Sequence, residues 1–285
     1  MGIWKNGAQA CVMLTFDFDA ELFWIARDPK SATRLGTLAH GMYGGKQGTL
    51  NVLRMLKEVE APATFFIPGV IIENYPKTVE KIVECGHEIG AHSWEHKWVE
   101  GASFETIEEE FLKTREVFER ITGQTWKGWR SHAWDIGIDD NYIRLLQKYH
   151  LGYSSSLMLQ EDPYLLELDG QKTDIVELPV HWILDDAAYW YCSRENLGGC
   201  IVSNGETLRT WQEDFDGLYK MGSLFNLTLH PQFVGRPGRV EMLRDLILWI
   251  RKHPNVWFAT ADEVATYYKE NKALFDEREA NLYNF

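Results

Sequence analysis

The chain has 285 residues, of which 42 are acidic and 29 basic, so its formal net charge is −13 at pH 7. This charge repels phosphate backbones and anionic lipids, so neither nucleic acid nor a membrane is expected as a partner. No stretch approaches the roughly 20 apolar residues of a membrane-spanning helix. The N-terminus lacks the basic run, apolar core and cleavage site of a signal peptide. Four cysteines without a CxxC spacing fit buried free thiols in a reducing compartment, so we expect a cytoplasmic protein.

Short apolar runs alternate with longer amphipathic runs, which is typical of a mostly parallel sheet wrapped by helices. Such runs predict strands at residues 10–16, 63–67, 87–91, 127–130, 152–156, 175–180, 224–229 and 256–259. They predict helices at residues 49–58, 75–83, 104–121, 141–150, 208–219 and 240–250. Thr260 and Glu263 have the spacing of a capping box that opens a last helix. No linker or repeat interrupts this order, so we predict one α/β domain over residues 1–285. The domain is expected to be barrel-like, with seven to eight strand and helix units. Its core is expected at about residues 10–270 and a polar surface tail at about 271–285.

Two segments, residues 21–47 and 185–205, lack a clear periodicity. Long irregular segments in compact domains are commonly functional, so we expect both to fold over the site and close it into a pocket. Their aromatic residues would form the walls: Trp24, Tyr43, Tyr189 and Trp190. Alternatively, these aromatic residues make contacts between subunits. We expect them to serve both as pocket walls and as subunit contacts, and we therefore expect a homo-oligomer.

Two pairs of polar residues suit a metal site. Asp17 and Asp19 are two apart near the end of an expected strand, which directs both carboxylates to one side of the sheet. His92 and His96 are four apart and reach one point if the chain makes a helical turn there. Taken singly, each pair has an ordinary alternative: surface histidines, or a solvated strand end.

Arg130 and His230 follow two further expected strands. Active groups of barrel enzymes gather at the C-terminal ends of strands, so these residues and the two pairs are expected on one rim. The alternatives are a structural ion pair for Arg130 and a backbone-bound histidine for His230. The combination favours a metal-dependent hydrolase.

Five segments stand in the order of the motifs of the polysaccharide deacetylase family, carbohydrate esterase family 4, which the chain resembles over roughly residues 10–270. They are Thr15–Asp19, His92–His96, Gly128–Trp134, Ile175–Pro179 and Leu227–Pro231. The HSxxH segment is the most specific. The Asp-x-Asp first motif is similar to the branch that includes peptidoglycan-deacetylase-like, allantoinase-like and cyclic imide hydrolase proteins. The resemblance implies an irregular (β/α) barrel with seven to eight strands.

The resemblance also implies a role for each matching residue. The divalent metal, most often zinc, would be bound by Asp19, His92 and His96. Asp17 would be the general base, oriented by Arg130, and His230 the general acid. Such a site hydrolyses carbon–nitrogen bonds other than peptide bonds.

This chain departs from the family pattern at two places. His132 stands where the third motif usually has a proline, so the pocket wall is expected to differ. Polymer-active members have an aspartate that supports the acid histidine, and Asp174, Asp185 and Asp186 all remain candidates here. The candidate substrate-binding residues are Trp24, Tyr43, His132, Trp134, Trp182, Tyr189 and Trp190.

Three functions stay open at this level. A polymer deacetylase meets its glycan outside the membrane, and the chain shows no export signal, which favours a small linear or cyclic amide, imide or ureide as substrate. The second function is N-deacetylation of amino sugars in peptidoglycan, chitin-like glycans or their oligomers. The third is a non-catalytic carbohydrate-binding relative, which the presence of base, ligands, arginine and acid histidine disfavours.

Overall fold

A computed structural model describes residues 2–97, 101–137, 139–193 and 201–281. Nine strands in these residues form one sheet in the order β6-β7-β5-β4-β3-β2-β1-β8, and β9 pairs with the first half of β1. All pairs are parallel except the β6/β7 hairpin. The strands are β1 Ala10–Asp17, β2 Thr64–Ile67, β3 Glu88–Ala91, β4 Gly128–Trp129, β5 Tyr153–Ser154, β6 Tyr164–Leu168, β7 Gln171–Glu177, β8 Leu224–Leu229 and β9 Val256–Ala259.

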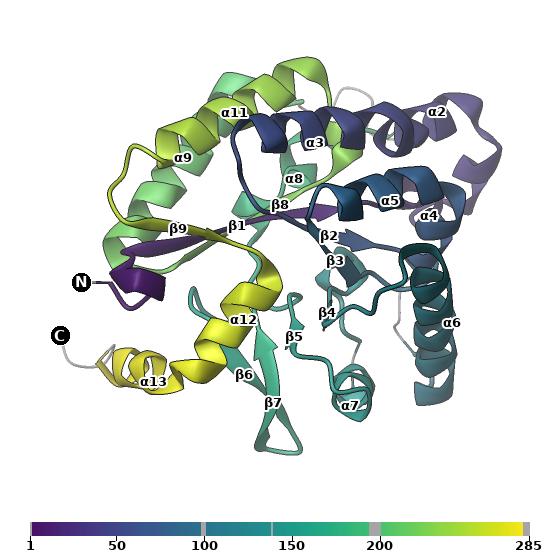
Figure 1. Ribbon diagram of the computed structural model, residues 1–285. Coiled ribbons are helices and arrows are strands. Elements are labelled where there is room, and N and C mark those ends of the chain that lie inside the picture. Colours follow the sequence, from purple (N-terminus) through teal and green to yellow (C-terminus); the bar gives the residue numbers. More distant parts are fainter. Residues whose placement is uncertain (1, 98–100, 138, 194–200, 282–285) are drawn as a thin grey trace.

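Helices surround the strands on the outside, as Figure 1 shows for α3, α5, α6, α9 and α11. The α-helices are α1 Leu22–Ile25, α2 Leu35–Tyr43, α3 Thr49–Glu58, α4 Gly69–Asn74, α5 Pro76–Glu84, α6 Phe104–Thr122, α7 Asn141–Lys148, α8 Ala187–Trp190, α9 Asn204–Met221, α10 Pro231–Val234, α11 Pro237–Ile250, α12 Ala261–Glu270 and α13 Lys272–Asn281. Short 3-10 turns are η1 Lys5–Gly7, η2 Pro29–Thr33, η4 His132–Trp134 and η5 Trp182–Leu184, and η3 Gly44–Gly48 is a π-helical turn. The predicted irregular (β/α) barrel is confirmed.

The β1 strand explains why the polar site lies above an apolar floor. Successive side chains of a strand point to opposite faces, and all eight residues of β1 are buried. The side chains of Val12, Leu14 and Phe16 pack outward against the helices. Cys11 and Met13 belong to a separate apolar cluster with residues of β2, β5 and β7. Thr15 and Asp17 continue this inner face, so the C-terminal end of the strand is where the barrel interior turns polar.

Two capping boxes set helix starts. The predicted box between Thr260 and Glu263 opens α12: the Thr260 side chain accepts the Glu263 N–H, and the Glu263 carboxylate accepts the Thr260 N–H. Ser203 and Glu206 form a second such box, which starts α9 at Asn204, four residues before the predicted start. Both pairs satisfy N–H groups that a helix start otherwise leaves without a partner.

Several parts of the chain differ from the sequence prediction. The β6 strand was not predicted; it pairs with β7 in the antiparallel hairpin. Residues 21–47, expected as irregular loop, are mostly helical because α1, η2 and α2 follow one another there. Residues 272–281 of the expected polar tail form α13, which is anchored by the buried Phe275, whose ring lies 5.2 Å from that of Trp4. Residues 282–285 of the tail lie outside the described part.

Among the described residues, no helix has both the length and the apolar character to cross a lipid bilayer. Cys11, Cys85 and Cys192 are free thiols, of which only Cys11 is buried as predicted; Cys85 is exposed and Cys192 is half-buried, and Cys200 lies outside the described residues.

Candidate metal and catalytic site

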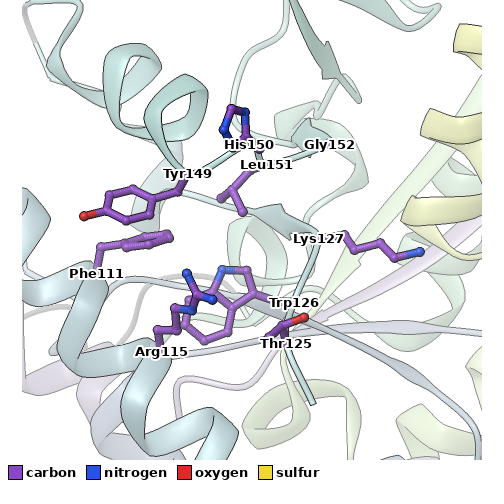
Figure 2. Close-up of a pocket in the computed structure, with 9 residues that line it drawn as sticks. All are labelled: Phe111, Arg115, Thr125, Trp126, Lys127, Tyr149, His150, Leu151 and Gly152. Atoms are coloured by element: carbon purple, nitrogen blue, oxygen red, sulfur yellow. The ribbon is translucent and has the colours of Figure 1, made fainter.

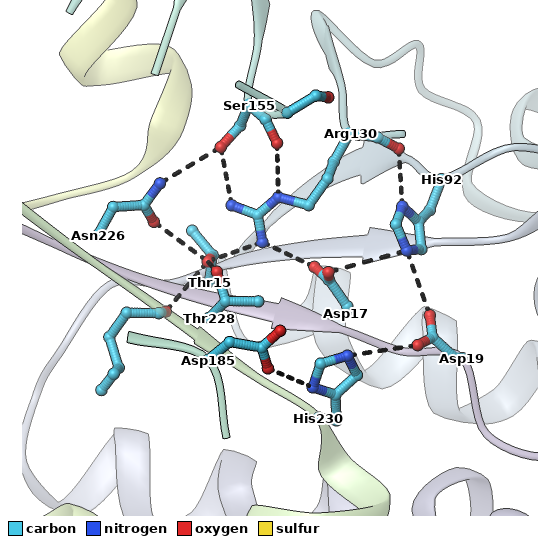
Figure 3. Close-up of polar contacts among 12 residues, drawn as sticks. Thr15, Asp17, Asp19, His92, Arg130, Ser155, Asp185, Asn226, Thr228 and His230 are labelled. Carbon is cyan, nitrogen blue, oxygen red and sulfur yellow. Dashed lines mark hydrogen bonds and ion pairs between the residues drawn. The ribbon is translucent and has the colours of Figure 1, made fainter. Parts of the chain in front are cut away.

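The polar residues predicted at strand ends converge above the barrel interior. Figure 3 shows side chains from β1, β3, β4 and β8, or from the residues just after these strands, pointing toward one another. The residues brought together in this way are Asp17, Asp19, His92, His96, Arg130 and His230.

Asp19 stands at the centre of the predicted metal triad. Its side chain has no solvent exposure, and neither carboxylate oxygen has a hydrogen-bond donor in the described residues. His92 Nε2 lies 3.4 Å from Asp19 Oδ1, and His96 Nε2 lies 3.3 Å from Oδ2. Burial acts to raise the pKa of Asp19, but the charges of His96, His92 and His230 outweigh it and lower this pKa. A buried carboxylate without donors, faced by two imidazole nitrogens, fits a bound divalent cation.

The His92–His96 segment is not a helical turn, so the predicted reason for the convergence of its histidines is wrong. Ser93 and His96 instead adopt left-handed backbone conformations, with φ of 63° and 58°. The His96 N–H donates to Ser93 Oγ at 3.1 Å, and the Ser93 carbonyl accepts the Gly69 N–H at 3.0 Å. The turn is therefore held by hydrogen bonds inside the segment and to the start of α4.

His92 is oriented by the backbone of the next strand. Its Nδ1 lies 2.7 Å from the carbonyl oxygen of Arg130, to which it donates when it carries the ring proton. This hydrogen bond leaves Nε2, which faces Asp19, as the nitrogen with a lone pair.

Arg130 joins Asp17 to the barrel wall. Its Nη1 donates to Asp17 Oδ1 at 2.8 Å and to Thr15 Oγ1 at 2.9 Å, while Nε and Nη2 donate to the carbonyl and hydroxyl of Ser155 at 3.0 and 2.8 Å. The guanidinium is fully buried over the ring of Phe66. The second oxygen of Asp17, Oδ2, lies on the side of the metal triad, 3.8 Å from His92 Nε2.

The aspartate that supports His230 is Asp186. Its Oδ1 lies 2.7 Å from His230 Nδ1, and its Oδ2 accepts the His230 backbone N–H at 3.0 Å. Asp185 Oδ1 is farther from Nδ1, at 3.6 Å, and Asp174 is an exposed residue of β7. Burial acts to lower the pKa of His230, but the charge and hydrogen bond of Asp186, followed by Asp185 and Asp19, raise it to about 10. His230 Nε2 faces the triad, 3.5 Å from Asp19 Oδ2.

Asp185, Asp186 and His230 also lie close enough together to form a second candidate metal-binding group. Both oxygens of Asp186 are already hydrogen-bonded to His230, and Asp185 Oδ1 accepts the Ala187 N–H at 2.8 Å. These contacts describe a hydrogen-bonded support for the histidine. Burial raises the pKa of Asp185 to about 7 and also raises that of Asp186.

Phe23 covers the site and is not among the residues predicted from the sequence. Its buried ring lies 5.3 Å from the ring of His230 and 6.4 Å from that of His96, measured between centroids. The available signal was an aromatic residue four positions after Asp19, inside the segment expected to close the pocket.

The predicted substrate-binding residues divide between the site and the surrounding packing. The rings of His132 and His96 lie 4.8 Å apart, and burial together with the charges of His96 and His92 lowers the pKa of His132 to about 2, so its ring is neutral at pH 7. Trp134 packs on the half-exposed Trp182, with centroids 4.4 Å apart.

The remaining four predicted residues have partners in the segments that surround the site. The Trp24 indole donates to the carbonyl of Cys192, and the Tyr43 hydroxyl donates to that of Gly235. Tyr189 and the fully buried Trp190 both pack against the ring of Trp211. Residues 194–200 of the second irregular segment lie outside the described part.

The opposite end of the barrel has a hollow of about 310 Å³, shown in Figure 2. Its lining includes Lys127 and Gly152, which directly precede β4 and β5, so it lies at the N-terminal ends of these strands. None of the converging polar residues lines it.

The model of the polysaccharide deacetylase family matches residues 5–151, more than half of the chain. The chain belongs to the polysaccharide deacetylase family. It is accordingly a hydrolase of carbon–nitrogen bonds other than peptide bonds, from a family whose members depend on a metal.

Individual relatives cover most of this family member. A protein from Helicobacter pylori named peptidoglycan deacetylase is 28% identical over 253 residues, which are 80% of this chain and 86% of that protein. A peptidoglycan deacetylase-like protein from Gibberella zeae is 24% identical, with 96% of this chain and 90% of that protein covered.

Solved structures share the fold. A presumed polysaccharide deacetylase from Mycobacterium smegmatis has 32% sequence identity and a TM-score of 0.88, covering 94% of this chain and 93% of that one. An allantoinase structure has a TM-score of 0.79 with the same coverage, but at 17% identity it shows the fold alone.

Proposed function

We propose that this deacetylase-family hydrolase acts on a small linear or cyclic amide, imide or ureide. The observation that carries the proposal is the burial of the reacting groups: Asp19, His92 and His230 are 0%, 1% and 5% exposed. Phe23 lies over the histidines. A glycan chain needs an open groove in which the sugars on both sides of the reacting one extend away, whereas a small amide fits an enclosed site.

Asp19, His92 and His96 would hold the metal, and a set of two imidazoles and one carboxylate favours zinc. Bound there, the ion would polarise the carbonyl of the substrate and make water more acidic. Three protein ligands leave positions for substrate and water, as a catalytic site requires.

Asp17 is the proposed general base. Arg130 holds its Oδ1, while Oδ2 faces the triad and is therefore the oxygen that accepts a proton from the attacking water. The structural alternative, an ion pair that only stabilises the fold, predicts that Oδ2 has no part in turnover.

His230 is the proposed general acid. Asp186 holds Nδ1, so Nε2 is the atom that donates a proton to the departing nitrogen. The departing nitrogen leaves as a neutral amine or, when a ring is opened, remains in the same molecule as the newly formed carboxylate through the other ring atoms.

N-deacetylation of amino sugars is the second candidate, favoured by the Helicobacter pylori relative named peptidoglycan deacetylase. The two candidates share the chemistry and differ in the size of the substrate. Fragments of one or two sugars are intermediate in size between a small amide and a glycan chain. A test should therefore include both sugar monomers and oligomers.

The test compares purified, zinc-loaded protein on succinimide and hydantoin with its action on N-acetylglucosamine and its oligomers. We expect turnover of the rings that depends on Asp17, with Asp17→Asn as the control for contaminating activity. Deacetylation of the oligomers alone would favour the second candidate. Turnover of neither class would overturn the proposal.

A further inference from the structure

A cation lies on the outer side of the ring that covers the site. The Cζ atom of Arg27 lies 3.8 Å from the ring centroid of Phe23 and 5.5 Å from that of Tyr191. Arg27 Nη1 donates to the Phe23 carbonyl at 2.7 Å, which fixes the guanidinium over the ring. Because the Phe23 ring also packs on His230, a single aromatic side chain separates the guanidinium from the proposed acid.

Arg27 retains unused hydrogen-bonding capacity. The residue is exposed, and in the part of the chain that the structure describes no carboxylate forms an ion pair with it. Within the same residues its Nε and Nη2 groups have no hydrogen-bond acceptor. Loss of water around the stacked face lowers the pKa of Arg27, and the charges of Asp19, Tyr191 and Asp185 act in the opposite direction. A guanidinium stays charged at neutral pH in either case.

Arg27 differs from the other cations near the site in having no carboxylate partner among the described residues. The two cations inside the site, Arg130 and the protonated His230, are already paired with Asp17 and Asp186, and the whole chain carries a net charge of −13. An anionic small molecule is therefore repelled by the protein as a whole and needs a local cation at the site to bind. The planar guanidinium suits a carboxylate in particular, because two parallel N–H groups match its two oxygens.

We propose that Arg27 binds an anionic group of the substrate, so that the substrate class is small amides that also carry a carboxylate apart from the scissile bond. This inference rests on the proposed function, hydrolysis of a small amide at the buried site. Arg27 then acts as a specificity-determining residue: it orients the substrate by its carboxylate while the amide reaches the triad.

A purely structural role makes a different prediction. If Arg27 only holds Phe23 over the histidines, its replacement should affect neutral and anionic substrates equally. Hydantoin and hydantoin-5-acetate separate these cases, because they share the scissile ring and differ by one carboxymethyl group, which carries the carboxylate.

The experiment uses the full-length, zinc-loaded protein with Arg27→Gln, Arg27→Lys and a matched control, Lys30→Gln. Lys30 is an exposed cation in η2 of the same segment, so its replacement removes one charge without touching Phe23. We expect the ratio of kcat/KM for hydantoin-5-acetate to that for hydantoin to fall roughly 10- to 100-fold in Arg27→Gln, as for loss of a charged hydrogen-bonded contact. The same ratio for Arg27→Lys should lie between those of the wild type and Arg27→Gln, and the ratio for Lys30→Gln should match that of the wild type. An equal loss on both substrates overturns the inference.

A binding measurement keeps the two proposals apart. Calorimetric titration with succinamate, a small amide with one carboxylate, requires no turnover. We expect weaker binding to Arg27→Gln by a similar factor and unchanged binding to Lys30→Gln. Absence of turnover on both rings would overturn the proposed function, whereas equal succinamate binding by wild type and Arg27→Gln, or none by the wild type, would overturn the role of Arg27.

Discussion

Asp17 Oδ1 and Arg130 Nη1 lie 2.8 Å apart in the barrel interior, and both side chains are buried. The pair divides the carboxylate into one oxygen that the protein holds and one that faces the metal triad. Because Arg130 fixes the orientation of this carboxylate, little conformational entropy is lost when Oδ2 accepts the proton in the transition state.

Replacing Asp17 by Asn keeps the shape of this pair but removes the proton acceptor. We expect kcat to fall by roughly 10²- to 10⁴-fold, the usual range for a positioned base. Zinc content, measured by mass spectrometry, should stay at the wild-type level because the three ligands remain. Full activity of Asp17→Asn would exclude Asp17 as the base.

Ser155 positions Arg130, so its hydroxyl should affect catalysis without touching substrate. This hydroxyl accepts from Arg130 Nη2 and donates to the carbonyl of Leu178 at 2.9 Å. Ser155→Ala leaves a buried donor and acceptor without partners, which costs about 1–3 kcal/mol in the free energy of unfolding. We expect kcat to fall as well, since the arginine then orients Asp17 less tightly.

Urea unfolding and steady-state kinetics measure these two effects, and Ser103→Ala is the matched control. Ser103 caps α6 on the surface, where loss of its hydroxyl costs about 1 kcal/mol. This control should lose stability and keep kcat. If Ser155→Ala also keeps the wild-type kcat, the hydroxyl has no positioning role.

Glu177 should make stability depend on pH. Its Oε1 accepts the backbone N–H groups of Ser156 and Leu157 at 2.5 and 2.8 Å, and burial raises its pKa from 4.5 to about 7 despite these bonds and the charge of Arg130. A carboxyl group with a raised pKa binds its proton more tightly in the folded state. Its contribution to stability is therefore fully present below about pH 4.5 and is lost as pH rises to about 7.

The loss amounts to about 3 kcal/mol and should be absent from Glu177→Gln, which stays neutral. We expect the variant to be more stable than the wild type at pH 8 and close to it at pH 5, by urea unfolding at each pH. Parallel pH profiles of the two proteins would contradict this assignment.

Metal removal should expose the unfavourable burial of Asp19. A chelator should abolish activity and lower the unfolding temperature, and added zinc should restore both. At a free zinc concentration of 100 times Kd the gain is about 2.7 kcal/mol. Asp19→Ala should show neither the zinc-dependent gain nor stoichiometric metal. An unfolding temperature of the wild type that does not respond to zinc would argue against the site.

Local patterns in the sequence were sufficient to predict most strands and the convergence of the site. Asp17, His92, Arg130 and His230 each follow an apolar run, and parallel strands bring their C-terminal ends to one edge. The strand ends therefore predicted the convergence of these four residues, whereas Asp19 and His96 were chosen from their spacing to Asp17 and His92. The β6 strand escaped prediction because its partner is the adjacent β7 in a hairpin, outside the alternating strand and helix pattern.

Contacts between distant segments decided the rest. From the sequence alone, Asp185 and Asp186 were equivalent candidates for the support of His230. In the structure, a parallel bridge joins Asp185 to Thr228, and the Asp186 N–H donates to the Thr228 carbonyl. These contacts place the segment beside β8 and bring Asp186 within hydrogen-bonding distance of His230. Phe23 likewise reaches His230 only after β1 and β8 pair. The sequence by itself determined which groups lie at the rim, because strand periodicity is local. Only the tertiary structure decided which of them touch, because those contacts depend on how non-adjacent segments pack.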